Sequence, residues 1–234
     1  MRRSLVVLLA ILAILKTPAG AQTCLGLAAY SEGPLQITGT GGLTNEASSF
    51  GAGLGYGRPA SVFGGLAIGT TSHEAVDGSS LELGTSVGYQ IPLGKTARAH
   101  LCPVASFGVG IGPQNTFNSG VDRSNKTASV GVALGIPFLA SPRMTIIPTV
   151  ALAYANRQDK AQNAAGASLF EITDNYARVQ LGIGLVLNSN ISVRPSADIP
   201  FGLDGREPTF GITLGYNFGS SRSPAPALGN SETQ

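Results

Sequence analysis

The last apolar segment of the chain alternates bulky and small residues with a period of two. Its bulky positions are Phe210, Ile212, Leu214, Tyr216 and Phe218, and the residues between them are Gly, Thr or Asn. A period of two is typical of a β-strand with one apolar and one small or polar face. The pattern recurs about ten times with turn residues between the copies. This predicts an all-β fold, a closed antiparallel transmembrane β-barrel with its apolar face toward lipid.

We expect ten strands, with eight as the alternative count. Strand ends read from a sequence carry an error of about 2–4 residues. The expected ranges are Leu35–Leu43, Ser48–Tyr56, Ser61–Thr71, Ser80–Ile91, Arg98–Ile111, Lys126–Phe138, Arg143–Asn156, Tyr176–Asn188, Ile191–Phe201 and Thr209–Phe218.

The connections between these strands alternate in length. Short turns such as Pro92–Ala97 and Ser189–Asn190 alternate with longer stretches, notably Ser72–Ser79, Gly112–Asn125 and Arg157–Asn175. Short periplasmic turns opposite longer external loops are typical of outer-membrane barrels, and an even strand count places both ends of the barrel on the periplasmic side.

Three prolines fall inside predicted strands, although proline cannot donate to the strand ladder. Pro103, Pro148 and Pro195 each lie a few residues after a short turn. We therefore expect β-bulges near the periplasmic rim, repeated at the level of the hairpin.

The N-terminus has the features of an export signal. Residues 1–21 combine two arginines, an apolar run too short to span a bilayer as a helix, and an Ala-Gly-Ala cleavage site. We assign 1–21 to a signal peptide, 22–34 to an N-terminal periplasmic segment or plug, 35–219 to the barrel and 220–234 to a disordered periplasmic tail. A lipid anchor on Cys24 is the competing interpretation, but Gln22 and Thr23 fit a lipobox poorly.

The amino-acid composition narrows the range of possible functions. Charged residues are 12% of the chain and the net charge is +2, which excludes a nucleic-acid binder, while 32 glycines suit a narrow barrel with a filled interior. The two cysteines and two histidines match no metal motif, and we expect no cofactor.

The two cysteines are predicted to form a disulfide, because an exported chain meets an oxidising compartment. Cys24 follows the cleavage site, and Cys102 lies near the periplasmic end of its strand on the lumen side. They can meet if the segment after Cys24 folds into the barrel mouth as a plug. The alternative is a free or lipidated Cys24 and a small buried Cys102.

The stretch Pro103–Gly110 resembles the proline-then-alternating-glycine strand of small Gram-negative outer-membrane β-barrel proteins, the porin-family or OmpA-like barrel group. The closing residues up to Tyr216 and Phe218 resemble the terminal aromatic signal of that group. The resemblance implies an outer-membrane location and recognition by the barrel-assembly machinery.

Two groups of residues could carry chemistry. His73, Glu74 and Asp77 form a His/acid cluster like that of omptin-type proteases, but all three come from one loop without a second acidic pair. A solvated loop accounts for them better, and we expect no enzymatic activity. The second group faces the lumen, where we expect a salt-bridge network rather than an ion pathway. Its members are Glu82, His100, Arg178, Arg194 and Asp198.

The sequence thus predicts an integral outer-membrane barrel with a structural or surface-interaction role in the cell envelope, and not an open pore. The alternatives are a narrow porin-like channel for small solutes and a soluble exported barrel that binds an apolar ligand. The expected partners are outer-membrane lipid and the barrel-assembly machinery, with no nucleic acid, and the expected state is a monomer.

Overall fold

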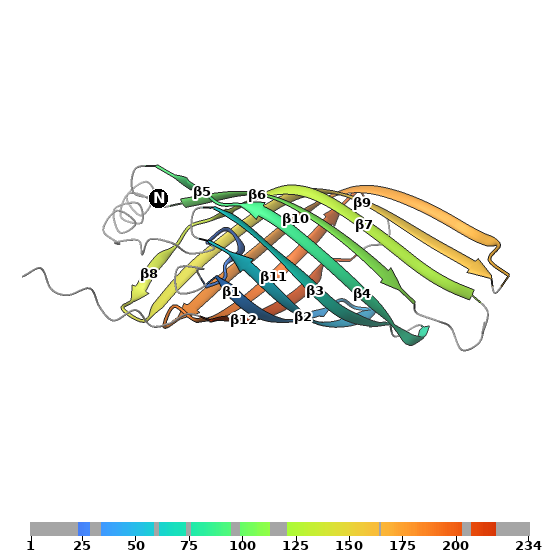
Figure 1. The fold of residues 1–234 in the computed structure, drawn as a ribbon, viewed down its shortest axis with the longest axis horizontal. Helices are drawn as coiled ribbons and strands as arrows, with labels where there is room; N and C mark the ends of the chain where they lie inside the picture. The colour runs from blue at the N-terminus through green and yellow to red at the C-terminus, as the bar shows by residue number, and fades with distance from the viewer. Residues whose placement is uncertain are drawn as a thin grey trace, which may run out of the picture.

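Antiparallel pairing runs around the whole molecule and closes it into a barrel (Figure 1). The computed structural model describes residues 23–28, 34–58, 61–73, 76–94, 99–112, 121–163, 165–202 and 207–218. The predicted signal peptide (1–21) and the predicted tail (220–234) lie outside these residues.

The described elements are one short 3-10 helix and twelve strands. They are η1 (Thr23–Leu25), β1 (Leu35–Leu43), β2 (Ala47–Gly57), β3 (Val62–His73), β4 (Val76–Tyr89), β5 (Ile91–Leu93), β6 (Ala99–Ile111), β7 (Val121–Gly135), β8 (Phe138–Ser141), β9 (Met144–Asn163), β10 (Ser168–Leu187), β11 (Ile191–Phe201) and β12 (Thr209–Phe218).

These twelve strands form the ten staves of the barrel, each of which we call a wall. The short strands β5 and β8 continue β4 and β7 and pair with β6 and β9, so each forms one wall with its predecessor. The ring closes where β1 pairs with β12, from Leu35 opposite Phe218 to Leu43 opposite Phe210. The predicted closed, ten-stranded antiparallel barrel is therefore confirmed, and β1, β11 and β12 have the predicted bounds.

The predicted long loops are wrong in large part, because strands continue through them. β9 runs to Asn163 and β10 begins at Ser168, so most of the expected loop 157–175 is a paired hairpin. β3 and β4 likewise extend into 72–79, and β7 begins at Val121. The hairpin of β9 and β10 projects beyond the rest of the barrel (Figure 1). Backbone hydrogen bonding between strands does not require an apolar face. A strand segment outside the lipid therefore lacks the hydrophobic alternation that marks a segment within the lipid.

The prediction of β-bulges at the three prolines is also wrong. Beside Pro103, Pro148 and Pro195 the ladder on one side loses two residue pairs and then resumes with the register unchanged. Pairing stops and resumes at Gly88–Val104 and Ile91–Leu101, at Gly135–Thr149 and Phe138–Ile146, and at Gly182–Ser196 and Leu185–Val193. The missing proline N–H weakens pairing locally without adding a residue to either strand.

The outer surface of the barrel is apolar, and the small residues face inward. In β12 the outward residues Ile212 and Leu214 are about half exposed, whereas the inward Gly215 and Asn217 are buried. Exposed aromatic side chains occur near both ends of the walls. They are Tyr56, Tyr89, Tyr216 and Phe218 near the short turns and Phe50, Phe107, Tyr154, Phe201 and Phe210 toward the opposite end. This is the arrangement of a lipid-facing belt between two aromatic girdles.

No helix among the described residues is long and apolar enough to cross a bilayer.

Candidate functional site: the plugged lumen

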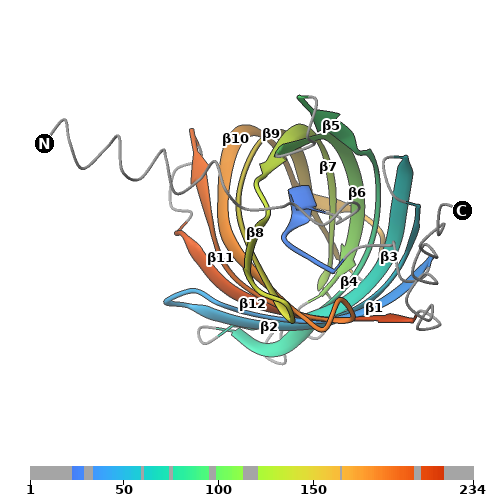
Figure 2. The same cartoon turned by 90° about the vertical axis from the view of Figure 1, so that its left-hand side faces the viewer.

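The N-terminal segment Thr23–Ala28 lies inside the barrel at the end that carries the short turns. Figure 2 shows this segment within the ring of strands. Thr23, Cys24 and Ala28 are fully buried or nearly so, and η1 contacts β6, β7 and β9. We call Thr23–Ala28 the plug.

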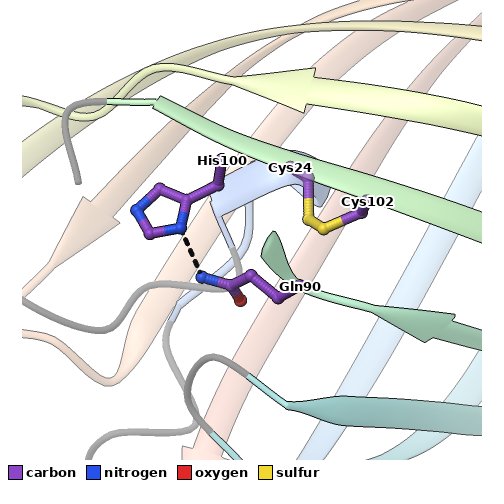
Figure 3. Close-up of a disulfide and its surroundings, with 4 residues drawn as sticks. All are labelled: Cys24, Gln90, His100 and Cys102. Atoms are coloured by element: carbon purple, nitrogen blue, oxygen red, sulfur yellow. Dashed lines mark hydrogen bonds between the residues drawn. A yellow bond between two sulfur atoms is a disulfide. The ribbon is translucent and has the colours of Figure 1, made fainter. Parts of the chain in front are cut away.

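The plug is held covalently by the predicted disulfide between Cys24 and Cys102, whose Cα atoms are 6.0 Å apart (Figure 3). Both cysteines are at most 1% exposed and pack with Phe63 and Ala133 in one apolar cluster. Cys102 reaches the plug because its even-numbered position in β6 faces the lumen, as the alternation predicts.

Two glycines of the barrel wall, Gly135 and Gly184, lie directly against the plug, and we call them the glycine seat. A Cβ on Gly135 of β7 would collide with the carbonyl group of Thr23, and a Cβ on Gly184 of β10 would collide with the backbone of Gly26. Glycine at these positions lets the plug backbone lie directly against the wall. The C-terminal end of the plug packs in a second apolar cluster, in which Ala28 joins Ile147 and Val186.

The five predicted lumen residues are all on the inward face, but the structure does not bring them into one network. Arg178 and Asp198 form an ion pair with Nη1–Oδ2 at 3.5 Å. Arg194 Nη2 donates to the side-chain oxygen of Gln180 at 2.9 Å, and His100 Nδ1 is hydrogen-bonded to Gln90 Nε2 at 2.8 Å (Figure 3). Glu82 lies farther from the plug and lines the outer part of the lumen.

An inward pair near the outer end, Arg157 and Asp159, is not among the residues predicted from the sequence. Arg157 Nε and Nη2 donate to the two carboxylate oxygens of Asp159 at 2.7 and 2.9 Å. Both lie in the part of β9 that was predicted as loop. The sequence does indicate that the strand continues here. The small inward residues Ala153 and Ala155 are followed, with the same period of two, by Arg157 and Asp159.

Arg157 lies beyond the apolar belt, since its outward neighbours are Asn156 and Gln158. Burial disfavours the charged form of Arg157, but the hydrogen bonds and the charge of Asp159 outweigh burial and raise the pKa of Arg157. Arg157 is therefore a permanent cation fixed to the rim by a bidentate contact.

A series of cavities leads from the outer mouth to the plug. The mouth holds a cavity of about 710 Å³, which shares Glu82 and Arg157 with the next cavity, of about 380 Å³. That cavity shares Gly84 and Thr127 with an inner one of about 340 Å³, whose lining includes the plug residues Leu25 and Leu27. The expectation of a filled lumen is therefore wrong. Glycine, serine and threonine leave space across ten walls, and the plug residues Leu25 and Leu27 line the inner end of that space.

The remaining predicted residues lie at the two ends of the barrel. His73 ends β3 and lines the mouth cavity, Glu74 lies outside the described residues, and Asp77 belongs to β4. At the opposite end Tyr216 and Phe218 point outward from β12 and meet edge to face, with ring centroids 5.0 Å apart.

No protein-family model matches the sequence, and no curated protein sequence matches it. Among solved structures, the chain is similar to the N-terminal β-barrel domain of Pseudomonas aeruginosa OprF, with 16% identity, a TM-score of 0.34 and coverage of 79% of this chain and 96% of that one. It is also similar to the translocator domain of the autotransporter NalP from Neisseria meningitidis, with 12% identity, a TM-score of 0.48 and coverage of 79% and 87%. A third match is the attachment invasion locus protein Ail of Yersinia pestis, with 14% identity, a TM-score of 0.34 and coverage of 78% and 95%.

Proposed function

We propose that this protein is an integral outer-membrane β-barrel whose periplasmic end is sealed by its own N-terminal plug, and that its role is structural or in surface interaction. The plug, buried in the lumen and tethered by the Cys24–Cys102 disulfide, is the observation that carries the proposal. Such a barrel has lipid as its partner, passes through the barrel-assembly machinery and acts as a monomer without catalysis.

The outer surface supports a membrane location. Half-exposed Leu, Ile, Val and Phe side chains cover the outside of the walls, as in β12 and in the neighbouring β1 and β2. A soluble protein rarely exposes a continuous apolar surface of this extent.

Two measurements test the sealed membrane barrel. We expect the folded protein in the membrane fraction, with a gel mobility that changes on boiling, and purification as a periplasmic monomer without detergent would contradict the location. In planar bilayers we expect no stable openings by the pure oxidised protein. Reproducible openings of that protein would contradict the seal.

The chain of cavities favours a second candidate, a narrow channel that conducts small solutes once the plug leaves. The same bilayer experiment distinguishes the two. The channel predicts stable openings after reduction of the Cys24–Cys102 disulfide, whereas a purely structural barrel stays closed. A Cys24→Ser and Cys102→Ser double variant serves as the control, because added reductant cannot change its conductance.

A further inference from the structure

The outer part of β10 has a free edge. β10 pairs with β11 only from Ala177, which lies opposite Phe201, whereas its pairing with β9 continues outward to Ser168. Among the residues that the structure describes, none pairs with 170–176 on the side of β10 that faces away from β9. This is the part of the hairpin that projects beyond the barrel (Figure 1). The projecting sheet therefore ends in an unpaired strand.

Alternate residues of this edge direct their backbone N–H and C=O groups away from β9. In an antiparallel ladder, residues that exchange hydrogen bonds with one neighbouring strand alternate with residues that point to the other side. The backbone N–H of Asn188 donates to the carbonyl oxygen of Arg143, so the even-numbered residues of β10 point toward β9. The register is unbroken from there to Phe170. Both backbone groups of Glu171, Thr173 and Asn175 therefore point to the free side.

The inward face of the same edge carries large apolar side chains that contact with lipid does not explain. Phe170 and Ile172 are 43% and 51% exposed and line the mouth cavity. Ile172 lies opposite Asp159, beyond the apolar belt. A strand added to this edge would cover both side chains through cross-strand contacts.

The charge of the edge is acidic. The charged residues within 168–176 are Glu171 and Asp174. The basic residues opposite them, Lys160 and Arg157, belong to β9 and lie on the side away from the free edge. The same segment contains no lysine and no proline, which proteins commonly use to protect an exposed edge. The edge therefore favours a partner strand with basic side chains over an acidic one.

We propose that the outer edge of β10 binds an extended segment of an external polypeptide, with alternating apolar and basic side chains, as an added strand. Backbone hydrogen bonds to Glu171, Thr173 and Asn175 hold the segment, and its apolar side chains cover Phe170 and Ile172. The inference rests on the proposed surface-interaction role and names the class of partner. Its failure would leave the membrane location and the seal unaffected, because those are measured separately.

A second copy in the same membrane fits this edge poorly. Both copies would present β10 in the same direction across the membrane, so the two edges could pair only in parallel, which is the less stable arrangement. The pairing would also bring Glu171 and Asp174 close to the same acids of the other copy. Like charges on neighbouring strands are unfavourable.

The first test uses the folded, oxidised protein in detergent and a capped synthetic peptide of alternating lysine and valine. We expect saturable binding by fluorescence anisotropy and, in NMR spectra, slower amide hydrogen exchange at Glu171, Thr173 and Asn175 when the peptide is bound. A peptide with glutamate in place of lysine should bind at least tenfold more weakly, roughly the effect of replacing attraction by repulsion at a rim charge. Absence of binding by the lysine peptide, or binding without slower exchange at these three residues, would overturn the proposal.

Two variants at one position test the edge itself. Thr173→Pro removes an N–H group that points to the free side and leaves the ladder with β9 intact, so it should weaken peptide binding by about fivefold or more. Thr173→Val keeps the N–H group and the branched shape, and should bind as the unaltered protein does. If Thr173→Pro fails to fold, the exchange data on the unaltered protein decide. Equal affinities of the two folded variants, or self-association of the protein in place of peptide binding, would contradict the proposal.

Discussion

Cys102 and Arg194 occupy equivalent places in two strands. Each directly precedes a proline, faces the lumen and contacts the plug, Cys102 through its disulfide and Arg194 through Gly26. Ile147, which precedes Pro148, packs in the same cluster as Ala28 of the plug. The hairpin-level repeat of prolines in the sequence therefore coincides with three of the places where the wall contacts the plug.

The disulfide should supply a large share of the stability. Replacing both cysteines, Cys24→Ser with Cys102→Ser, removes a cross-link between residues 78 positions apart. The chain-entropy model then gives a loss of about 3–5 kcal/mol in the free energy of unfolding. Urea titration of the detergent-folded protein, followed by far-ultraviolet circular dichroism, measures this loss. Reduced unaltered protein should match the double variant, and equal midpoints for oxidised and reduced protein would contradict the prediction.

The glycine seat should tolerate no side chain. Gly184→Val places a side chain where the Gly26 backbone lies, so we expect a loss of about 1–3 kcal/mol from overpacking and faster reduction of the disulfide by added thiol. Gly84→Val is the matched control, because the nearest atom to its Cβ position is the carbonyl oxygen of Phe107 at 3.8 Å. Similar reduction rates in the two variants would mean that the plug does not rest on Gly184.

Much of the fold was predictable because lipid imposes a strict pattern. Wherever a wall crosses the apolar belt, one face is bulky and the other small, and β1, β11 and β12 were predicted to the residue. Beyond the belt the outward face becomes polar, with Asn156, Gln158 and Lys160 in β9 paired with Asn175, Thr173 and Glu171 in β10, so the bulky outward face that marks a strand in lipid is missing there. Backbone pairing through this region sets the register of β9 against β10. The amino-acid composition does not reveal that register.

Residues of the site were predictable only where the alternation along a strand shows which face a side chain lies on. The parity of position 102 and its distance from a short turn predicted that Cys102 meets Cys24. Arg194 of β11 and Thr149 of β9 meet beside Gly182 of β10, and no local pattern encodes that arrangement. The inward positions were predicted, but their partners depend on registers that the structure alone supplies.

The Arg157–Asp159 contact should contribute modestly. Both side chains are partly exposed, at 23% and 31%, so water screens the pair despite its bidentate geometry. We expect Asp159→Asn to lower the free energy of unfolding by about 0.5–1 kcal/mol, and less in high salt. A double-mutant cycle with Arg157→Gln isolates the coupling. A coupling energy that does not fall as salt is added would contradict the ionic account.

The cost of a charge on the outer face should depend on its depth in the belt. Leu214 lies in the middle of β12 and is 54% exposed, and Leu43 ends β1 at the outer rim and is 61% exposed. We expect Leu214→Arg to lower folding stability in lipid vesicles by about 2–4 kcal/mol and Leu43→Arg by about 0–1 kcal/mol, because desolvation of the guanidinium is largest at the bilayer midplane. Urea titrations of both variants in vesicles measure the difference, with Leu214→Met as the control for packing. Two leucines of similar exposure would respond alike if water surrounded the barrel, so equal losses for the two arginine variants would contradict a lipid belt.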